Sequence, residues 1–242
     1  MNGKTVKTLG CRILLLIGLV TAADSARPED AKSAYPNRAA LELYLMADRK
    51  AEINLARSAA PAALSDHATV LVLGLKGYEV AAKGDNGFTC LVERSWMSPF
   101  DSAEFWNPKM RGPICYNPPA TRTILPYTVK TTELALAGQS KAQIKAQIQA
   151  IVANQELPMP EAGAMSYMLS KGGYLGDEVG HWHPHLMFHV PKTDAANWGA
   201  NLPYSPVELD TAHRDVPEPE TIFLVPVGNW SDGTSAHVPI VH

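Results

Sequence analysis

Five residues whose side chains can bind a metal recur at every second position near the C-terminal end of the chain. They are His181, His183, His185, Met187 and His189, and they include half of the eight histidines. The residues between them are all apolar. Because a β-strand points alternate side chains to opposite faces, this spacing predicts a strand over 181–189 with one histidine-rich and one hydrophobic face.

Neutral imidazole binds zinc, copper and iron, so the histidine-rich face is a candidate metal site formed from His181, His183, His185 and His189. On an ideal strand the first and last of these would lie roughly 26 Å apart, which is too far to share one ion. We therefore expect a primary pair of His183 with His181 or His185, completed from another segment. The residues that could complete it are Glu93, Asp101, Glu104, Asp177, Glu178, His213, His237 and His242.

Pro184 complicates this strand because it has no N–H to donate to a neighbouring strand. It fits an edge strand or a bulge, either of which could direct a ligand into a cleft. Alternatively, the strand begins at His185, and His181 and His183 lie in the loop before it.

Two interpretations do not need a metal. The histidines could line an ion-free pocket, or they could form the solvated face of an antiparallel sheet, where alternating polar residues are expected. Met187 is usually a packing residue, and its position is only a weak indication of copper.

Several known catalytic signatures are absent: there is no H-E-x-x-H helix, G-x-S-x-G turn, Walker loop, G-x-G-x-x-G motif or EF-hand loop. The histidine run resembles the H-x-H element of a cupin. Since no glutamate follows at the expected short interval, no cupin ligand is transferred to this chain. Residues distant in the sequence could still form a Ser-His-Asp arrangement in the fold, but the order of residues selects no nucleophile.

The N-terminus has the pattern of a secretory signal peptide. Lys4, Lys7 and Arg12 precede an apolar run over 13–20, and small residues follow. The run is too short for a stable membrane span, which needs about 20 residues. We expect cleavage near Ala23, with Ala26 as the alternative, and a mature protein that is secreted or periplasmic.

Removal of residues 1–23 would take three of the 21 basic residues and none of the 24 acidic ones, leaving 18 against 24. A mildly acidic chain without basic clusters argues against nucleic acid as a partner. A small molecule or an envelope ligand is the expected partner. The 219 residues from 24 to 242 are enough for a single domain with a full core.

Two of the three cysteines, Cys90 and Cys115, would remain after export. An even pair in an oxidising compartment predicts a disulfide, which would close a loop of about 25 residues. Two separate thiols or a cysteine-based metal site are the alternatives.

The rest of the chain predicts an α+β fold with a mainly antiparallel sheet, an N-terminal helix and a central helical pair. We expect helices over 38–58, 128–137 and 140–154, the first capped by Asn37 and the last by Ser140 with Gln143. The expected strands are 69–75, 78–82, 88–93, 164–169 and 221–227. The second and third of these flank the 83–87 segment, whose Asn-Gly favours a hairpin. Residues 95–126 show no regular period.

Four stretches resemble those of secreted bacterial proteins of unassigned function: CLVERSW (90–96), GAMSYMLSK (163–171), GHWHPHLMF (180–188) and WGANLP (198–203). The resemblance implies a bacterial envelope setting and brings no activity, cofactor or catalytic residue.

Our hypothesis is an exported protein with a metal-binding pocket on the 181–189 strand. If it is an enzyme, metal-dependent hydrolysis or redox chemistry fits best, with Glu178 or Glu93 as the base. A non-catalytic envelope ligand-binding protein and a structural protein are the rivals.

Overall fold

The computed structural model describes residues 34–177, 180–210 and 217–236. The signal peptide expected at 1–23 and the candidate ligands Glu178, His213, His237 and His242 therefore lie outside the described residues. In the part that is described, no helix is both long enough and apolar enough to cross a membrane.

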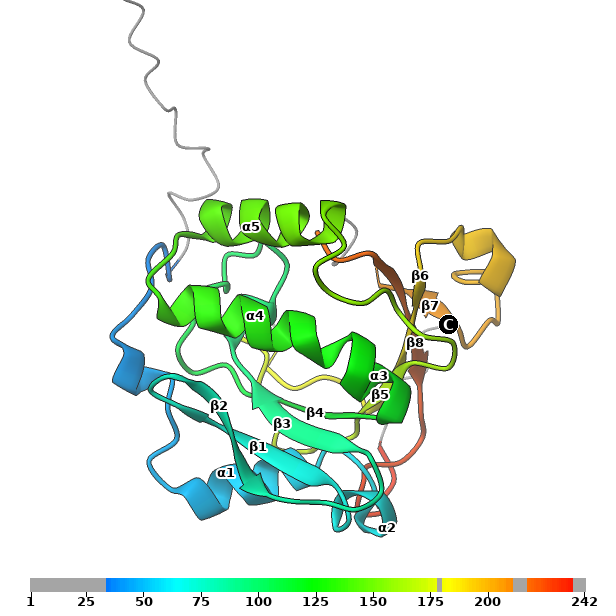
Figure 1. The fold of residues 1–242 in the computed structure, drawn as a ribbon. Coiled ribbons are helices and arrows are strands. Elements are labelled where there is room, and N and C mark those ends of the chain that lie inside the picture. Colours follow the sequence, from blue (N-terminus) through cyan, green and yellow to red (C-terminus); the bar gives the residue numbers. More distant parts are fainter. Residues whose placement is uncertain (1–33, 178–179, 211–216, 237–242) are drawn as a thin grey trace, which may run out of the picture.

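Eight strands form one mixed sheet, which is the centre of the fold (Figure 1). The strand order is β2-β1-β3-β4-β5-β6-β8-β7, and each neighbouring pair is antiparallel except the parallel pair of β1 and β3. The predicted α+β class with a mainly antiparallel sheet is confirmed. The strands are β1 (Thr69–Gly74), β2 (Gly77–Ala82), β3 (Thr89–Glu93), β4 (Gly112–Tyr116), β5 (Met165–Met168), β6 (His185–Pro191), β7 (Glu208–Leu209) and β8 (Glu220–Pro226).

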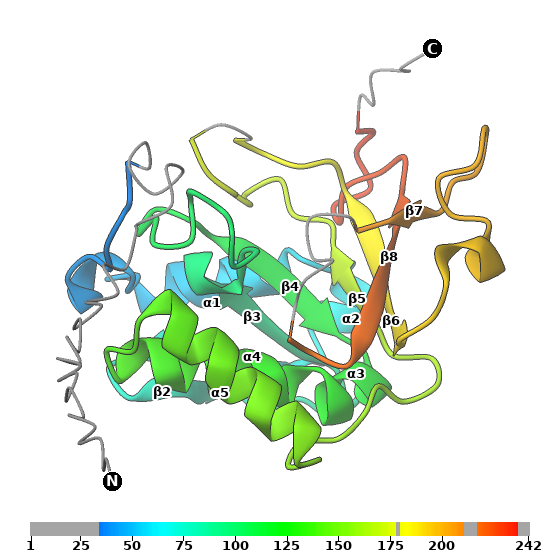
Figure 2. The ribbon, with the colours of Figure 1, turned by 90° about the horizontal axis from the view of Figure 1, so that it is seen from above.

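Helices lie on both sides of this sheet (Figures 1 and 2). The α-helices are α1 (Arg49–Arg57), α2 (Ala62–Ser65), α3 (Pro118–Thr123), α4 (Leu125–Leu136) and α5 (Lys141–Ala153), and short 3-10 helices cover Leu41–Leu43, Ser95–Met97 and Ala195–Trp198. The helix α1 packs small residues such as Ala56 against β1, β3 and β4. On the opposite side, α4 and α5 pack Leu134, Ile144 and Ile148 around Trp96.

The first helix is shorter than the sequence predicts. It begins at Arg49 because Asp48 is its N-cap, with the carboxylate accepting from the backbone N–H groups of Lys50 and Ala51. The chain before it is held by Tyr44, which is fully buried and donates its hydroxyl to the carbonyl of Trp106 at 2.9 Å. In contrast, the predicted capping box of Ser140 and Gln143 is present at the start of α5.

The hairpin expected over 83–87 is wrong. Instead β2 pairs with β1 through the tight turn before Gly77, and β3 lies on the other side of β1. The reason is the use made of Asn86: its side chain donates to the carbonyl of Leu64 at 2.8 Å and accepts from the N–H of Phe88 at 3.0 Å. The segment is therefore a crossover held against α2.

The predicted disulfide is present between Cys90 and Cys115, which are register partners on β3 and β4. Their Cα atoms are 4.0 Å apart. The expectation of an irregular segment over 95–126 needs correction, because β4, α3 and the start of α4 lie within it. Proline residues obscured these elements: Pro113 lies inside β4, and Pro118 occupies the first position of α3, where no backbone donor is needed.

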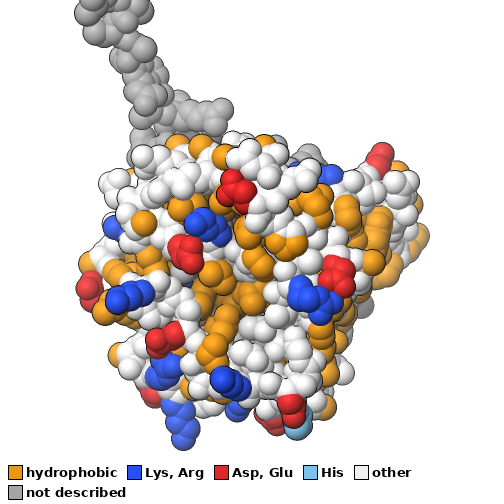
Figure 3. All heavy atoms as spheres, in the orientation of Figure 1, with side chains coloured by type: hydrophobic (Ala, Val, Ile, Leu, Met, Phe, Trp, Pro, Cys, Tyr) orange, Lys and Arg blue, Asp and Glu red, His pale blue; other side chains and the backbone are white. Residues whose placement is uncertain are grey.

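The outer surface over α4 and α5 carries no single sign of charge. Figure 3 shows acidic and basic side chains interspersed on this face, with hydrophobic side chains between them.

Candidate functional site

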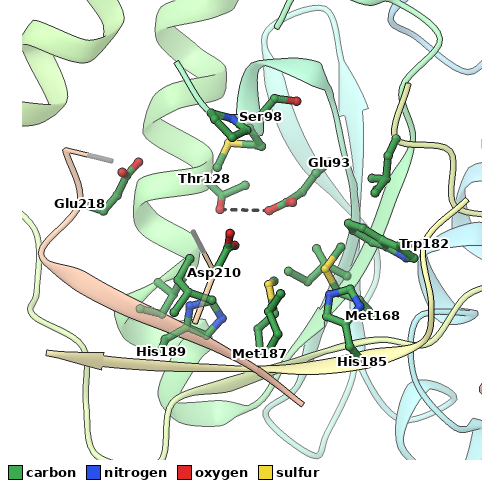
Figure 4. Close-up of a pocket in the computed structure, with 18 of the residues that line it drawn as sticks. Glu93, Ser98, Thr128, Met168, Trp182, His185, Met187, His189, Asp210 and Glu218 are labelled. Atoms are coloured by element: carbon green, nitrogen blue, oxygen red, sulfur yellow. Dashed lines mark hydrogen bonds between the residues drawn. The ribbon is translucent and has the colours of Figure 1, made fainter. Parts of the chain in front are cut away.

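A cavity of about 950 Å³ lies between the sheet and the helical layer. Its walls come from β4, β5, β6 and β8, from α4, and from the loop between β3 and β4. Most of the lining is apolar, with Trp96, Phe100, Ile114, Tyr127 and Trp182 among the large side chains. We call this space the central cavity; Figure 4 shows ten of its residues labelled.

The strand β6 provides one wall of the central cavity. His185, Met187 and His189 line the cavity, as the predicted alternation requires, and Figure 4 shows all three pointing from β6 into it. On the other face of the strand, Phe188 packs against Trp198 with ring centroids 6.3 Å apart. The strand begins at His185, so the alternative with His181 and His183 in the preceding loop is the one observed.

The four candidate metal ligands do not converge on one point. The Nδ1 atom of His181 is hydrogen-bonded to the carbonyl of Gly173, and this side chain does not line the cavity. His183 is an exposed residue that borders the cavity, while His189 is buried at its other end. Within 34–177, 180–210 and 217–236, no three His, Cys, Asp or Glu side chains are grouped so that they could hold an ion.

Of the carboxylates proposed to complete the site, Glu93 and Glu104 line the central cavity, whereas Asp101 and Asp177 do not. The carboxylate of Asp177 accepts hydrogen bonds from Tyr174 and Tyr35 outside the cavity.

His185 has a defined orientation. Its Nδ1 lies 2.7 Å from the carbonyl oxygen of His183, and because a carbonyl only accepts, the ring N–H is at Nδ1. In the neutral ring this leaves the lone pair at Nε2. Burial lowers the pKa of His185 below its ordinary value, which favours the neutral form. The ring of Trp182 contacts the imidazole edge-to-face, with centroids 4.9 Å apart.

His189 has partners at both ring nitrogens. Its Nδ1 donates to a carboxylate oxygen of Glu220 at 2.8 Å, and its Nε2 is 3.0 Å from the hydroxyl of Ser166. The order of hydroxyl, imidazole and carboxylate is that of an acyl-transfer triad. However, Ser166 is 0% exposed, so a substrate carbonyl cannot reach it in this conformation. The arrangement fits a polar network that fixes His189.

Opposite β6, Glu93 accepts a hydrogen bond from the hydroxyl of Tyr116 at 2.7 Å. It accepts a longer one from Thr128 at 3.5 Å (Figure 4). Burial, together with the charge of Glu93, raises the pKa of Tyr116 well above its ordinary value, so the phenol stays protonated and donates.

Several residues of this site were missed by the sequence analysis. Met168 lies in a predicted strand, and its period-two relation to the polar Ser166 could have assigned both to one face. The acidic residues Asp210, Glu218 and Glu220 also line the cavity. In the sequence they lie before and after 211–216, where hydrophobic residues show no regular spacing, so no sequence signal identified them.

No family model, curated protein or solved structure matches this chain.

Proposed function

We propose that this protein is an exported binding protein that holds a small, mainly apolar ligand in the central cavity. The observation that carries the proposal is the cavity itself. Its volume of about 950 Å³ is in the range of small-molecule sites, and its lining is aromatic and aliphatic with a few polar groups. An apolar space of this size gains free energy when a ligand with matching surface fills it.

Binding is favoured over hydrolysis by the state of the polar groups. Ser166 is inaccessible, and His189 already uses both ring nitrogens. Metal-assisted hydrolysis would need a base beside a bound water. Of the two bases proposed from the sequence, Glu93 lies in the cavity. Its carboxylate accepts hydrogen bonds from the hydroxyls of Tyr116 and Thr128, so it is already engaged with protein groups.

The disulfide supports the exported setting. Cys90 and Cys115 are joined inside the sheet, and such bonds persist in oxidising compartments. Together with the N-terminal pattern over 1–23, this supports cleavage near Ala23 and a secreted or periplasmic protein. The likeness of 180–188 to secreted bacterial proteins points to the same setting.

Gly112 offers a direct test, because a side chain added there would enter the cavity. A Cβ at this position would lie 3.5 Å from the Cβ of Glu93 and 3.9 Å from Cε of Met168, which is ordinary contact. Gly112→Val should therefore fold and reduce the space for a ligand. Gly74→Val is the matched control: its Cβ would also have its nearest atoms at 3.5 Å, and it does not line the cavity.

The measurement is the fluorescence of N-phenyl-1-naphthylamine, a neutral apolar probe, titrated with each protein. We expect saturable binding of one probe per wild-type chain, at least tenfold weaker binding to Gly112→Val, and unchanged binding to Gly74→Val. Absence of saturable binding to the wild type, or equal affinity in both variants, would refute the proposal.

A further inference from the structure

We propose that the central cavity contains a site for monovalent copper, Cu(I), formed by the sulfur atoms of Met168 and Met187 and by Nε2 of His185, with the ring of Trp182 beside the ion. This inference deepens the proposed function, since it assigns a ligand to one wall of the same cavity. It also replaces the ion site sought from four histidines by one that uses a single histidine and two thioethers.

The strand register brings these side chains together. Met168 and His185 are partners across the β5–β6 pair, and both line the cavity. Directly opposed residues of an antiparallel pair have Cβ atoms about 4.5–5.5 Å apart on the same face. Met187 follows His185 by two positions and therefore points to that face as well. In Figure 4 the labelled side chains of Met168, Met187 and His185 all point into the cavity.

The orientation of His185 is that of a metal ligand. Its Nδ1–H is held by the carbonyl of His183 at 2.7 Å, an arrangement that fixes the tautomer and aims the Nε2 lone pair. Methionine side chains have three rotatable bonds and can adjust their sulfur positions around the fixed imidazole.

The ligand types select the ion. Thioether sulfur is a soft ligand and prefers Cu(I), whereas zinc and iron are held by imidazole, thiolate and carboxylate groups. Cys90 and Cys115 are committed to a disulfide, so their sulfur atoms cannot serve as thiolates. Thioethers do not form disulfides, which makes methionine the soft ligand suited to an oxidising compartment.

The surroundings of the three ligands favour a bound cation. Trp182 lines the cavity and contacts the His185 ring, and tryptophan is the best aromatic partner for a cation. Glu93, Asp210 and Glu218 line the same space, and the described residues around it include no lysine or arginine. The apolar walls exclude the hydration shell that a harder ion would retain.

The test is a competition experiment with the mature protein, purified without an affinity tag. Under anaerobic conditions with ascorbate, the protein is titrated into the Cu(I) complex of bicinchoninate, and loss of the dye colour reports transfer of the ion. We expect one Cu(I) bound per chain, with a change in tryptophan fluorescence that saturates at the same ratio. Zinc should not cause this change.

Leucine variants separate the sulfur ligands from the packing they provide. Met168→Leu and Met187→Leu keep the volume and the apolar character of each side chain but remove the sulfur. Each should weaken Cu(I) binding at least tenfold, and the double variant should abolish competition with the dye. The matched control is Met97→Leu, which changes another methionine of the cavity wall and should alter the affinity less than twofold.

Binding of the naphthylamine probe distinguishes this inference from the proposed function. The leucine variants should unfold at urea concentrations close to the wild-type midpoint, which shows that they are folded. If the wild type binds the probe but takes no Cu(I) from the dye, or if the double variant retains Cu(I) affinity, the copper site is refuted and the apolar pocket stands. If the wild type takes up Cu(I) but does not bind the probe, the copper site stands and the apolar pocket is refuted.

Discussion

His189 and Glu220 form a buried hydrogen-bonded pair across β6 and β8, with Nδ1 of the imidazole 2.8 Å from the carboxylate. The side chains are 3% and 8% exposed. Because Ser166 occupies the other ring nitrogen, the three residues form one continuous network between β5, β6 and β8. This network connects the strands that carry the cavity wall.

Replacing His189 should destabilise the fold. His189→Ala would leave the Ser166 hydroxyl and the Glu220 carboxylate buried without their shared partner, at an expected cost on the order of 2–4 kcal/mol in the free energy of unfolding. Urea denaturation measures this loss in the free energy of unfolding. His183→Ala, at an exposed position, is the control and should change stability by less than about 0.5 kcal/mol. Equal effects of the two variants would show that the network contributes nothing.

The buried ion pair of Arg94 and Glu52 predicts a second large effect. Their side chains are 0% and 2% exposed, and the guanidinium also donates to the carbonyl of Tyr44 at 2.7 Å. Arg94→Met would leave a buried carboxylate without its cation, at an expected cost of about 3–5 kcal/mol. The double variant Glu52→Leu, Arg94→Met removes both charges and should recover part of this loss. A double variant that is less stable than Arg94→Met would contradict this account.

Loss of the disulfide should lower stability without changing the strand register. The bond closes a loop with a sequence separation of 25, for which the chain-entropy model gives about 3 kcal/mol. We expect the double variant Cys90→Ala, Cys115→Ala to unfold at a lower urea concentration, with its free energy of unfolding reduced by about 3 kcal/mol. Wild-type protein unfolded in the presence of dithiothreitol should give a similar midpoint, and an unchanged midpoint in both cases would refute the prediction.

Asp177 predicts a pH-dependent contribution to stability. Hydrogen bonds from Tyr174 and Tyr35 lower the pKa of its carboxyl group to about 2, from an ordinary value of 3.8. Since the folded state holds the proton less tightly than the unfolded state, this stabilisation is fully present above pH 3.8 and is lost as the pH falls through 2.

Asp177→Asn should therefore be less stable than the wild type at pH 6, and the difference should shrink between pH 3.8 and 2. Urea midpoints at several pH values provide the measurement. Asp66→Asn, at an exposed position after α2, is the control. A difference that stays constant down to pH 2 would exclude the carboxylate as its source.

The wall of the cavity was predictable where it depends on one strand. Period-two alternation placed His185, Met187 and His189 on a common face, and β6 shows this arrangement. The sequence could not select the strand beside β6, because register depends on contacts between distant segments. Met168 and Glu220 were therefore missed as neighbours of these residues.

Local signals failed where tertiary contacts used the same residues differently. Asn86 favoured a hairpin, yet the hydrogen bonds that its side-chain amide makes with Leu64 and Phe88 hold a crossover instead. The apolar and alanine-rich sequence before Asp48 favoured a longer helix, but Tyr44 is drawn into the core, and the helix begins after it. Propensity alone does not report either of these contacts.

The strands β4 and β5 are joined by only two register pairs, Cys115 with Tyr167 and Tyr116 with Ser166. On one side of this junction, Ile114 and Tyr116 reach the cavity, and on the other side Met187 and His189 do. A ligand that spans the cavity would therefore contact both halves of the sheet. Its binding would oppose their separation, so the bound protein should show the largest slowing of amide hydrogen exchange at the β4–β5 junction.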